Sequence, residues 1–401
     1  MDAKLTQEAL ERGRGIFRLI PAWVPRSFCR PGRRIRLHPD DYYALGLERG
    51  GIDERWFSST THAENGPATP EDEGLSYIAV DAMGGERVLL RDAVDVLKGA
   101  AVGEKIWEEH NGWPIYSKFF DNLGPLPHHI HHDDARAARV NQRGKPEMYF
   151  FPSQVNNYGG EFPFTFFGLN PGTTRERLVT ALKNFTKGDN NILGLSRSYK
   201  LELDTGWDVP PGVLHAPGSL CTYEPQFASD VYAMYQSVLY FGHCVPEELL
   251  WKDCPPEEKG NYEYLADVLD WDMNLDPDFQ RNRFMAPIPA GCAEEMNGSG
   301  YMEEWICYKS EAVSAKRLTV FPGRSVKIKD EAAYGIICLQ GRGKFGVWDL
   351  ESPALIRYGQ LTNDEFFVTH GAAKEGVVIQ NLSGVEDIVI LKHFAGHPKG
   401  D

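Results

Sequence analysis

Four histidines within five residues are the most chemically informative feature of this sequence. They are His128, His129, His131 and His132, and two aspartates follow them directly. In an extended chain, residues i and i+2 point to the same face of the strand, about 6–7 Å apart. Two imidazoles on one face can bind one metal ion, and by spacing alone either the inner or the outer pair can face inward. A solvated loop tip is the alternative, because paired aspartates are typical of a surface turn.

Two further side chains could complete such a site. Glu147 lies in an aromatic, strand-like run after the histidines, and His215 follows a Pro-Pro-Gly turn. Three histidines and one glutamate suit a borderline divalent metal such as Zn, Mn, Fe or Co. Lys145 lies two residues before Glu147, so on a strand both side chains reach the same face. The alternative for Lys145 is an exposed lysine on an edge strand.

The composition restricts the classes of partner. The net charge of −15 over 401 residues argues against nucleic acid and anionic membrane as partners. The seven cysteines are widely spaced, odd in number and form no CxxC, which favours reduced thiols in the cytoplasm. The first residues lack the apolar core of a signal peptide, and no apolar run approaches the ~18 residues of a membrane span.

The elements that would position the site are mainly β. Short runs closed by Gly, Pro or Asn predict strands both before and after an acidic, Pro-rich segment at 245–283. We expect this segment to be a helical or irregular connector between two β-rich units. At the N-terminus, apolar residues at helical spacing predict a helix over residues 5–19, closed by Pro21.

Two motifs are interpreted without a catalytic role. Residues 30–36 carry four arginines, and we interpret them as a solvated turn or a surface that forms salt bridges with a second subunit. Residues 341–346 match GxGxxG, but a strand is predicted to follow where a dinucleotide site needs a helix. We therefore expect a β-turn there.

Several separated motifs occur in the order found in class I mannose-6-phosphate isomerases of the cupin superfamily, and the chain resembles that family over most of its length. The matching segments are Glu54-Arg55-Trp56, residues 116–126, residues 129–134, Lys145-Pro146-Glu147, residues 209–216, Glu224 and Ser229-Asp230. Any one of them alone would be a weak signal.

The resemblance implies a fold and a domain organisation. It implies a mainly β chain with two cupin-type β-barrel or jelly-roll domains and a few peripheral helices. Residues 1–244 would form the catalytic, metal-binding domain with helical insertions. Residues 245–283 would be the connector, and residues 284–401 a second cupin-like domain without metal.

The resemblance also implies roles for single residues. Alignment on the two aspartates after the histidines makes His129, His131, Glu147 and His215 the ligands of one divalent metal ion. We expect zinc, with Mn, Fe and Co as alternatives. The candidate catalytic residues, for substrate contacts or proton transfer, are Lys145, Glu224 and Asp230.

The function implied is that of a metal-dependent aldose–ketose isomerase acting on a sugar or sugar phosphate through a metal-stabilised enediolate. Two positions depart from the family: His129 stands where glutamine is usual, and Met234 stands where an arginine is expected. The lost arginine puts a phosphorylated substrate in question. The alternatives are an iron-dependent cupin dioxygenase and a catalytically inactive sugar-binding cupin. We expect a small-molecule sugar as partner and a homodimer as the assembly.

Overall fold

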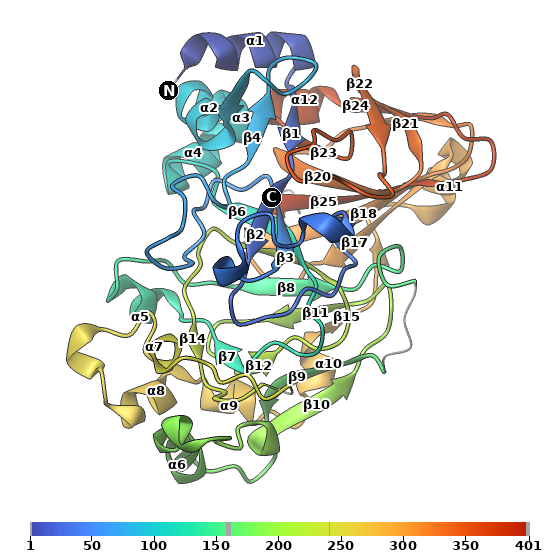
Figure 1. The fold of residues 1–401 in the computed structure, drawn as a ribbon. Helices are drawn as coiled ribbons and strands as arrows, with labels where there is room; N and C mark the ends of the chain where they lie inside the picture. Colours follow the sequence, from blue (N-terminus) through green and yellow to red (C-terminus); the bar gives the residue numbers. More distant parts are fainter. Residues whose placement is uncertain (1, 158–161, 240, 398–401) are drawn as a thin grey trace.

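The candidate site lies between two facing antiparallel sheets in the lower half of Figure 1. The structure is a computed structural model that describes residues 2–157, 162–239 and 241–397. The five-stranded sheet comprises, in spatial order, β10 (Ser196–Lys200), β9 (Phe164–Leu169), β12 (His215–Ala216), β7 (His129–Ile130) and β14 (Ala233–Met234). The seven-stranded sheet comprises β15 (Phe284–Met285), β11 (Gly206–Val209), β8 (Glu147–Phe150), β13 (Thr222–Phe227), β6 (Ile115–Phe120), β3 (Ile52–Phe57) and β2 (Ala22–Pro25).

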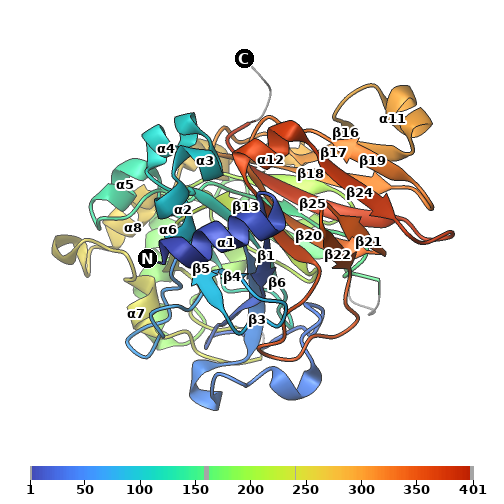
Figure 2. The same ribbon diagram turned by 90° about the horizontal axis from the view of Figure 1, so that it is seen from above.

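Two further sheets form the other half of the molecule (Figures 1 and 2). The nine-stranded sheet comprises β16 (Ile288–Pro289), β17 (Tyr301–Cys307), β18 (Val313–Val320), β25 (Ile388–Ala395), β20 (Tyr334–Gln340), β23 (Glu365–Val368), β1 (Ile16–Ile20), β4 (Tyr77–Ala79) and β5 (Arg87–Leu89). The four-stranded sheet comprises β19 (Ser325–Ile328), β24 (Val377–Asn381), β21 (Arg342–Phe345) and β22 (Trp348–Glu351). β21 and β22 form a hairpin, so a strand does follow the GxGxxG segment. The predicted β-turn at 341–346 is wrong for most of its length, because residues 342–345 pair as β21 and the turn lies at 346–347.

The helices are short and lie at the periphery of the sheets, as Figures 1 and 2 show. They are α1 (Ala3–Gly13), α2 (Leu90–Leu97), α3 (Gly99–Val102), α4 (Glu104–His110), α5 (Asp134–Ala138), α6 (Arg175–Lys183), α7 (Glu247–Leu250), α8 (Tyr262–Val268), α9 (Trp271–Asn274), α10 (Phe279–Arg283), α11 (Ala293–Ser299) and α12 (His370–Glu375). No helix of the described part of the chain has the length and apolar character needed to cross a bilayer.

The predicted helix over residues 5–19 is wrong in its second half. Helix α1 ends at Gly13, where Arg14 adopts left-handed backbone angles, and Gly15 also has a positive φ. The apolar residues that follow form β1, which pairs with β23 through Ile16 and Val368. These residues form a strand rather than a continued helix for two reasons. β-branched residues that follow a glycine-terminated helix favour an extended chain, and pairing within the sheet gives them a neighbouring strand on each side.

Strands from the first ninety residues share a sheet with strands from the C-terminal region. β1 lies between β23 and β4, so segments on both sides of the predicted boundaries at 244 and 284 belong to one sheet. Buried Arg55 of β3 adds a bidentate ion pair to Asp364, 2.8 Å at each contact, and contacts Glu365 at 3.1 Å. The division into 1–244, 245–283 and 284–401 stays a prediction. Parts of its first and last ranges lie outside the described residues.

Candidate metal centre

Three buried histidines converge between the two sheets of the site. β12 pairs with β7 so that His215 lies opposite His129, and His131 follows β7 directly. One ring nitrogen from each of His129, His131 and His215 lies within 4.8 Å of the others. The Pro-Pro-Gly turn helps to set this arrangement, since the N–H of Gly212 donates to the carbonyl of His131 at 2.9 Å. Gly212 has a positive φ of 83°, which glycine adopts without strain.

Backbone carbonyls fix the orientation of all three rings. Nδ1 of His129 donates to the carbonyl of Pro127 at 2.8 Å. Nδ1 of His131 donates to the carbonyl of Val231 at 2.7 Å, and Nδ1 of His215 donates to the carbonyl of Val213 at 2.8 Å. A carbonyl oxygen only accepts, so each Nδ1 carries the proton and each neutral ring keeps a lone pair on Nε2. Such anchoring is the usual support of a metal-binding histidine.

Glu147 faces these lone pairs from the opposite sheet. Its carboxylate lies 3.1 Å from Nε2 of His131 and 3.2 Å from Nε2 of His215. Oε2 of Glu147 and Nε2 of His215 are buried without a hydrogen-bond partner in the described structure. Burial lowers the pKa of His131 to about 3. The Lys145 ammonium lies 2.9 Å from Oε2 of Glu147, and a metal ion would in addition satisfy the converging imidazole lone pairs. The donor set fits a divalent metal.

Two residues near Glu147 complete its surroundings. Lys145 Nζ lies 2.9 Å from Oε2 of Glu147 and 3.1 Å from Nε2 of His131, so Lys145 faces the pocket rather than solvent. The hydroxyl of Tyr149 donates to Oε1 of Glu147 at 2.7 Å. Burial raises the pKa of the Glu147 carboxyl, but the neighbouring His131 and Lys145 outweigh it and hold the pKa well below the usual range.

The outer two histidines of the run lie elsewhere. His128 and His132 are both buried, which excludes the solvated loop tip. Nδ1 of His128 contacts the Gln236 side chain at 2.6 Å, and neither residue belongs to the cluster of three.

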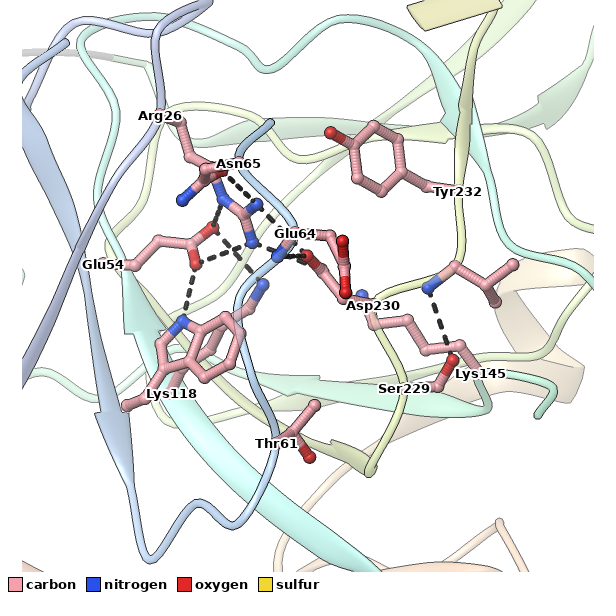
Figure 3. Close-up of polar contacts among 12 residues, drawn as sticks. Arg26, Glu54, Thr61, Glu64, Asn65, Lys118, Lys145, Ser229, Asp230 and Tyr232 are labelled. Carbon is pink, nitrogen blue, oxygen red and sulfur yellow. Dashed lines mark hydrogen bonds and ion pairs between the residues drawn. The ribbon is translucent and has the colours of Figure 1, made fainter. Parts of the chain in front are cut away.

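A polar network around Arg26 lies along the pocket that His129 and His131 also line (Figure 3). Arg26 lies between two carboxylates: its guanidinium contacts Glu54 at 3.2 Å and Asp230 at 3.2 Å. Asp230 also accepts from the backbone N–H of Glu64 at 3.1 Å. Burial raises the pKa of Asp230, but the charge of Arg26 outweighs it and lowers the pKa below the ordinary value. Asp230 is therefore an ionised partner of Arg26.

Glu224 has a different environment. Its Oε1 lies 3.4 Å from both Lys118 and Lys145, and the atom has no hydrogen-bond partner among the described residues. Burial and the nearby Glu147 raise the pKa of Glu224 to about 8, against the opposing charges of the two lysines. Of the candidate carboxyls at the pocket, Glu224 is thus the one whose pKa suits proton transfer near neutral pH.

The pocket beside these residues is small, with a volume of about 40 Å³, and Met234 lines it. Met234 pairs in register with His129, so its side chain lies close to the metal centre. Sequence reasoning missed Arg26 and Tyr232, which also line the pocket. Only the placement of an arginine in a short apolar stretch, Trp-Val-Pro-Arg, could have indicated the role of Arg26.

Comparison with solved structures supports the fold. The chain superposes on a mannose 6-phosphate isomerase from Bacillus subtilis with a TM-score of 0.59 and 14% identity, covering 94% of this chain and 99% of that one. A phosphomannose isomerase variant from Salmonella typhimurium superposes with a TM-score of 0.63 and 12% identity, covering 95% of this chain and 100% of that one. A zinc-bound mannose 6-phosphate isomerase superposes with a TM-score of 0.62 and 12% identity, covering 95% of this chain and 100% of that one. No family model and no curated sequence matches the chain.

These similarities confirm the predicted fold class and the resemblance on which it rested. The chain is mainly β, with antiparallel sheets arranged as in these isomerases over nearly its whole length. At this level of identity the comparison concerns the fold, and the chemistry must be argued from the side chains of this chain.

Proposed function

We propose that this protein is a metal-dependent aldose–ketose isomerase. The observation that carries the proposal is the convergence of three anchored imidazole lone pairs and the Glu147 carboxylate in a buried pocket. His129, His131, His215 and Glu147 would hold one divalent ion, with zinc first because a zinc-bound isomerase shares the fold. That ion would polarise the sugar carbonyl and stabilise the negative charge of an enediolate.

Lys145 and Glu224 would then carry out the remaining chemistry. Isomerisation moves a proton between C1 and C2 of the sugar and another between its two oxygens. Glu224 is buried and within reach of the lysine that faces the metal centre, so we assign it the proton transfer. Lys145 donates hydrogen bonds from a buried ammonium and would stabilise a developing oxyanion. Asp230 fixes Arg26, because both its oxygens contact that guanidinium.

The charges of the pocket favour a sugar without phosphate. Arg26, Lys118 and Lys145 line it, and each lies within 3.4 Å of a carboxylate. Met234 offers no further cation, so a phosphate dianion would have to displace existing ion pairs. A cavity of about 40 Å³ is also far below the ~300–1,000 Å³ of typical ligand sites. Side chains must therefore move to admit a hexose.

A substrate panel tests the proposal. Zinc-loaded protein is incubated with free and phosphorylated aldoses, and ketose formation is followed by chromatography. We expect turnover of at least one free aldose, loss of turnover after chelation, and recovery on adding zinc. A parallel oxygen electrode records any oxygen uptake. Oxygen consumption with iron and no ketose would replace the isomerase by a dioxygenase, and tight sugar binding without turnover would indicate an inactive binder.

The pH profile of Glu224→Gln is a second expected result. In the wild-type enzyme the active carboxylate forms as pH rises, so kcat/KM should increase with pH, with an apparent pKa below about 8, because the bound metal favours the ionised form. Glu224→Gln should lose about 100-fold or more in kcat, within the usual range for removing a general base, and should lose this rise. Asp230→Asn serves as the comparison, since it should keep the rise. A profile unchanged in Glu224→Gln would contradict the assignment.

A further inference from the structure

A second cavity lies away from the metal centre and is strongly basic. It has a volume of about 610 Å³ and shares no lining residue with the metal-site pocket. Its charged lining residues are Arg33, Arg34, Arg36, Arg342, Glu351 and Glu386. Four arginines against two glutamates leave a net charge of +2, in a protein whose net charge is −15. Pockets of roughly 300–1,000 Å³ accommodate ordinary small-molecule ligands.

The cavity is built from segments far apart in the sequence. The carbonyl of Arg36 accepts from the N–H of Ile356 at 2.8 Å, and the N–H of His38 donates to the carbonyl of Ile356 at 2.8 Å. Figure 2 shows the red segment that follows β22 descending toward the blue N-terminal loops. Arg34 fixes the other wall through an ion pair to buried Asp121 at 2.7 Å. Arg34 and Arg36 are therefore held against other segments of the chain, whereas Arg30 and Arg33 of the same run are exposed.

Arg36 donates its side-chain hydrogen bonds to neutral acceptors, and burial lowers its pKa although the nearby charge of Asp364 opposes this. Arg36 is partly buried, and its guanidinium donates to the carbonyl of Leu339 at 2.7 Å and to the hydroxyl of Ser352. Both acceptors are neutral, and Arg36 forms no ion pair among the described residues. The side chain of Arg342 is exposed and has no hydrogen bond or ion pair within the described ranges. A guanidinium withdrawn from water without a carboxylate is costly unless an anion reaches it.

The backbone around these arginines is also unusual. Arg33 and Arg36 adopt φ values of 72° and 67°, a conformation that costs a non-glycine residue on the order of 1–3 kcal/mol. Strain of this kind persists where surrounding contacts impose it, and here the contacts to Ile356 and Asp121 hold the run in place. The strained turn presents guanidinium groups of the same short run to one cavity.

We propose that this cavity binds a phosphorylated small molecule, with the phosphate held by Arg36 and Arg342. Guanidinium groups match phosphate oxygens in planar, two-point hydrogen bonds, and phosphate carries more charge than a carboxylate. The organic part would lie against Leu339 and Leu355, which also line the cavity. The site shares no lining residue with the metal-site pocket, so a test of phosphate binding and a test of isomerase activity can fail independently.

Calorimetric titration of the full-length protein tests the proposal. The probes are AMP, glycerol 3-phosphate and inorganic phosphate, with adenosine as the uncharged control. We expect AMP to bind, adenosine not to bind, and affinity to fall with added salt. Binding of inorganic phosphate as tight as that of AMP would support the phosphate subsite and identify free phosphate as its ligand. Absence of binding by all three phosphates would overturn the proposal.

Variants separate the cavity from other anion sites. Arg342→Ser removes an exposed side chain without contacts, so it should fold normally and lower the affinity for AMP by about 10-fold, the equivalent of one charge-assisted hydrogen bond. Arg36→Met should lower it at least as much. Lys344→Ser removes a neighbouring exposed cation outside the lining and should leave binding unchanged. His131→Ala should also bind AMP normally. Unchanged affinity in Arg342→Ser and Arg36→Met would overturn the proposal.

Discussion

Replacement of His131 by alanine is expected to reduce the zinc content of the purified protein from about one ion per chain to below about one tenth. His131 contributes an Nε2 lone pair that its Nδ1 contact to Val231 aims at the cluster, and it lies against Glu147. Loss of a residue that merely supports a ligand typically costs about 10- to 100-fold in metal affinity, and loss of a ligand costs more. Ketose formation should fall with the metal content, because the remaining residues do not polarise the carbonyl.

The matched control for this variant is His132→Gln. His132 is a buried histidine of the same run but lies outside the cluster, so its replacement tests whether any disturbance of the run releases the metal. Metal content is measured by atomic emission after dialysis, and affinity by competition with a chelator. Full zinc retention in His131→Ala, or equal loss in both variants, would contradict the ligand assignment.

Replacement of Arg55 by methionine is expected to lower the free energy of unfolding by about 3–5 kcal/mol, the usual cost of removing one partner of a buried ion pair. Arg55 is almost wholly buried and joins the sheet of the metal site to β23 through Asp364 and Glu365. Without it, two adjacent buried carboxyls lose their counter-ion. Such a loss is a large fraction of the ~5–15 kcal/mol that stabilises a typical domain.

The effect of Arg55→Met should grow with pH. Burial, opposed by Arg55, raises the pKa of Glu365 to about 8, so the folded state favours the protonated acid. This contribution to stability is complete below the unfolded pKa and is lost as pH rises through about 8. Denaturant unfolding at pH 6 and pH 9 should therefore show a larger deficit at pH 9. Lys344→Ala, which breaks an exposed ion pair to Asp349, should change stability by less than about 1 kcal/mol. Equal stability of Arg55→Met and wild type would contradict the account.

The grouping of the candidate metal ligands was predictable from sequence to the extent that these residues come from local motifs. His129 and His131 share a face because of their i, i+2 spacing, and Glu147 and Lys145 do so for the same reason. The Pro-Pro-Gly sequence predicts the turn before His215. Local spacing does not show which pair of histidines faces His215 and Glu147, since both pairs are buried, and that choice came from the family resemblance.

The parts that depend on long-range contacts were not predictable. Arg26 reaches the pocket across about two hundred residues of chain to Asp230, and no local pattern encodes that pairing. The placement of β1 beside β23 is of the same kind: the apolar residues after Gly13 continue a helical period, and only the partner strand decides for an extended chain. The arginine run likewise gave no sign that Arg36 would be partly buried at a cavity.

Anomalous scattering at the zinc edge, on crystals grown with zinc, tests the central claim most directly. We expect one anomalous peak bonded to Nε2 of His129, His131 and His215 at about 2.0–2.1 Å, with Glu147 as the oxygen ligand. A peak bonded through His128 or His132, or no peak between the two sheets of the site, would contradict it.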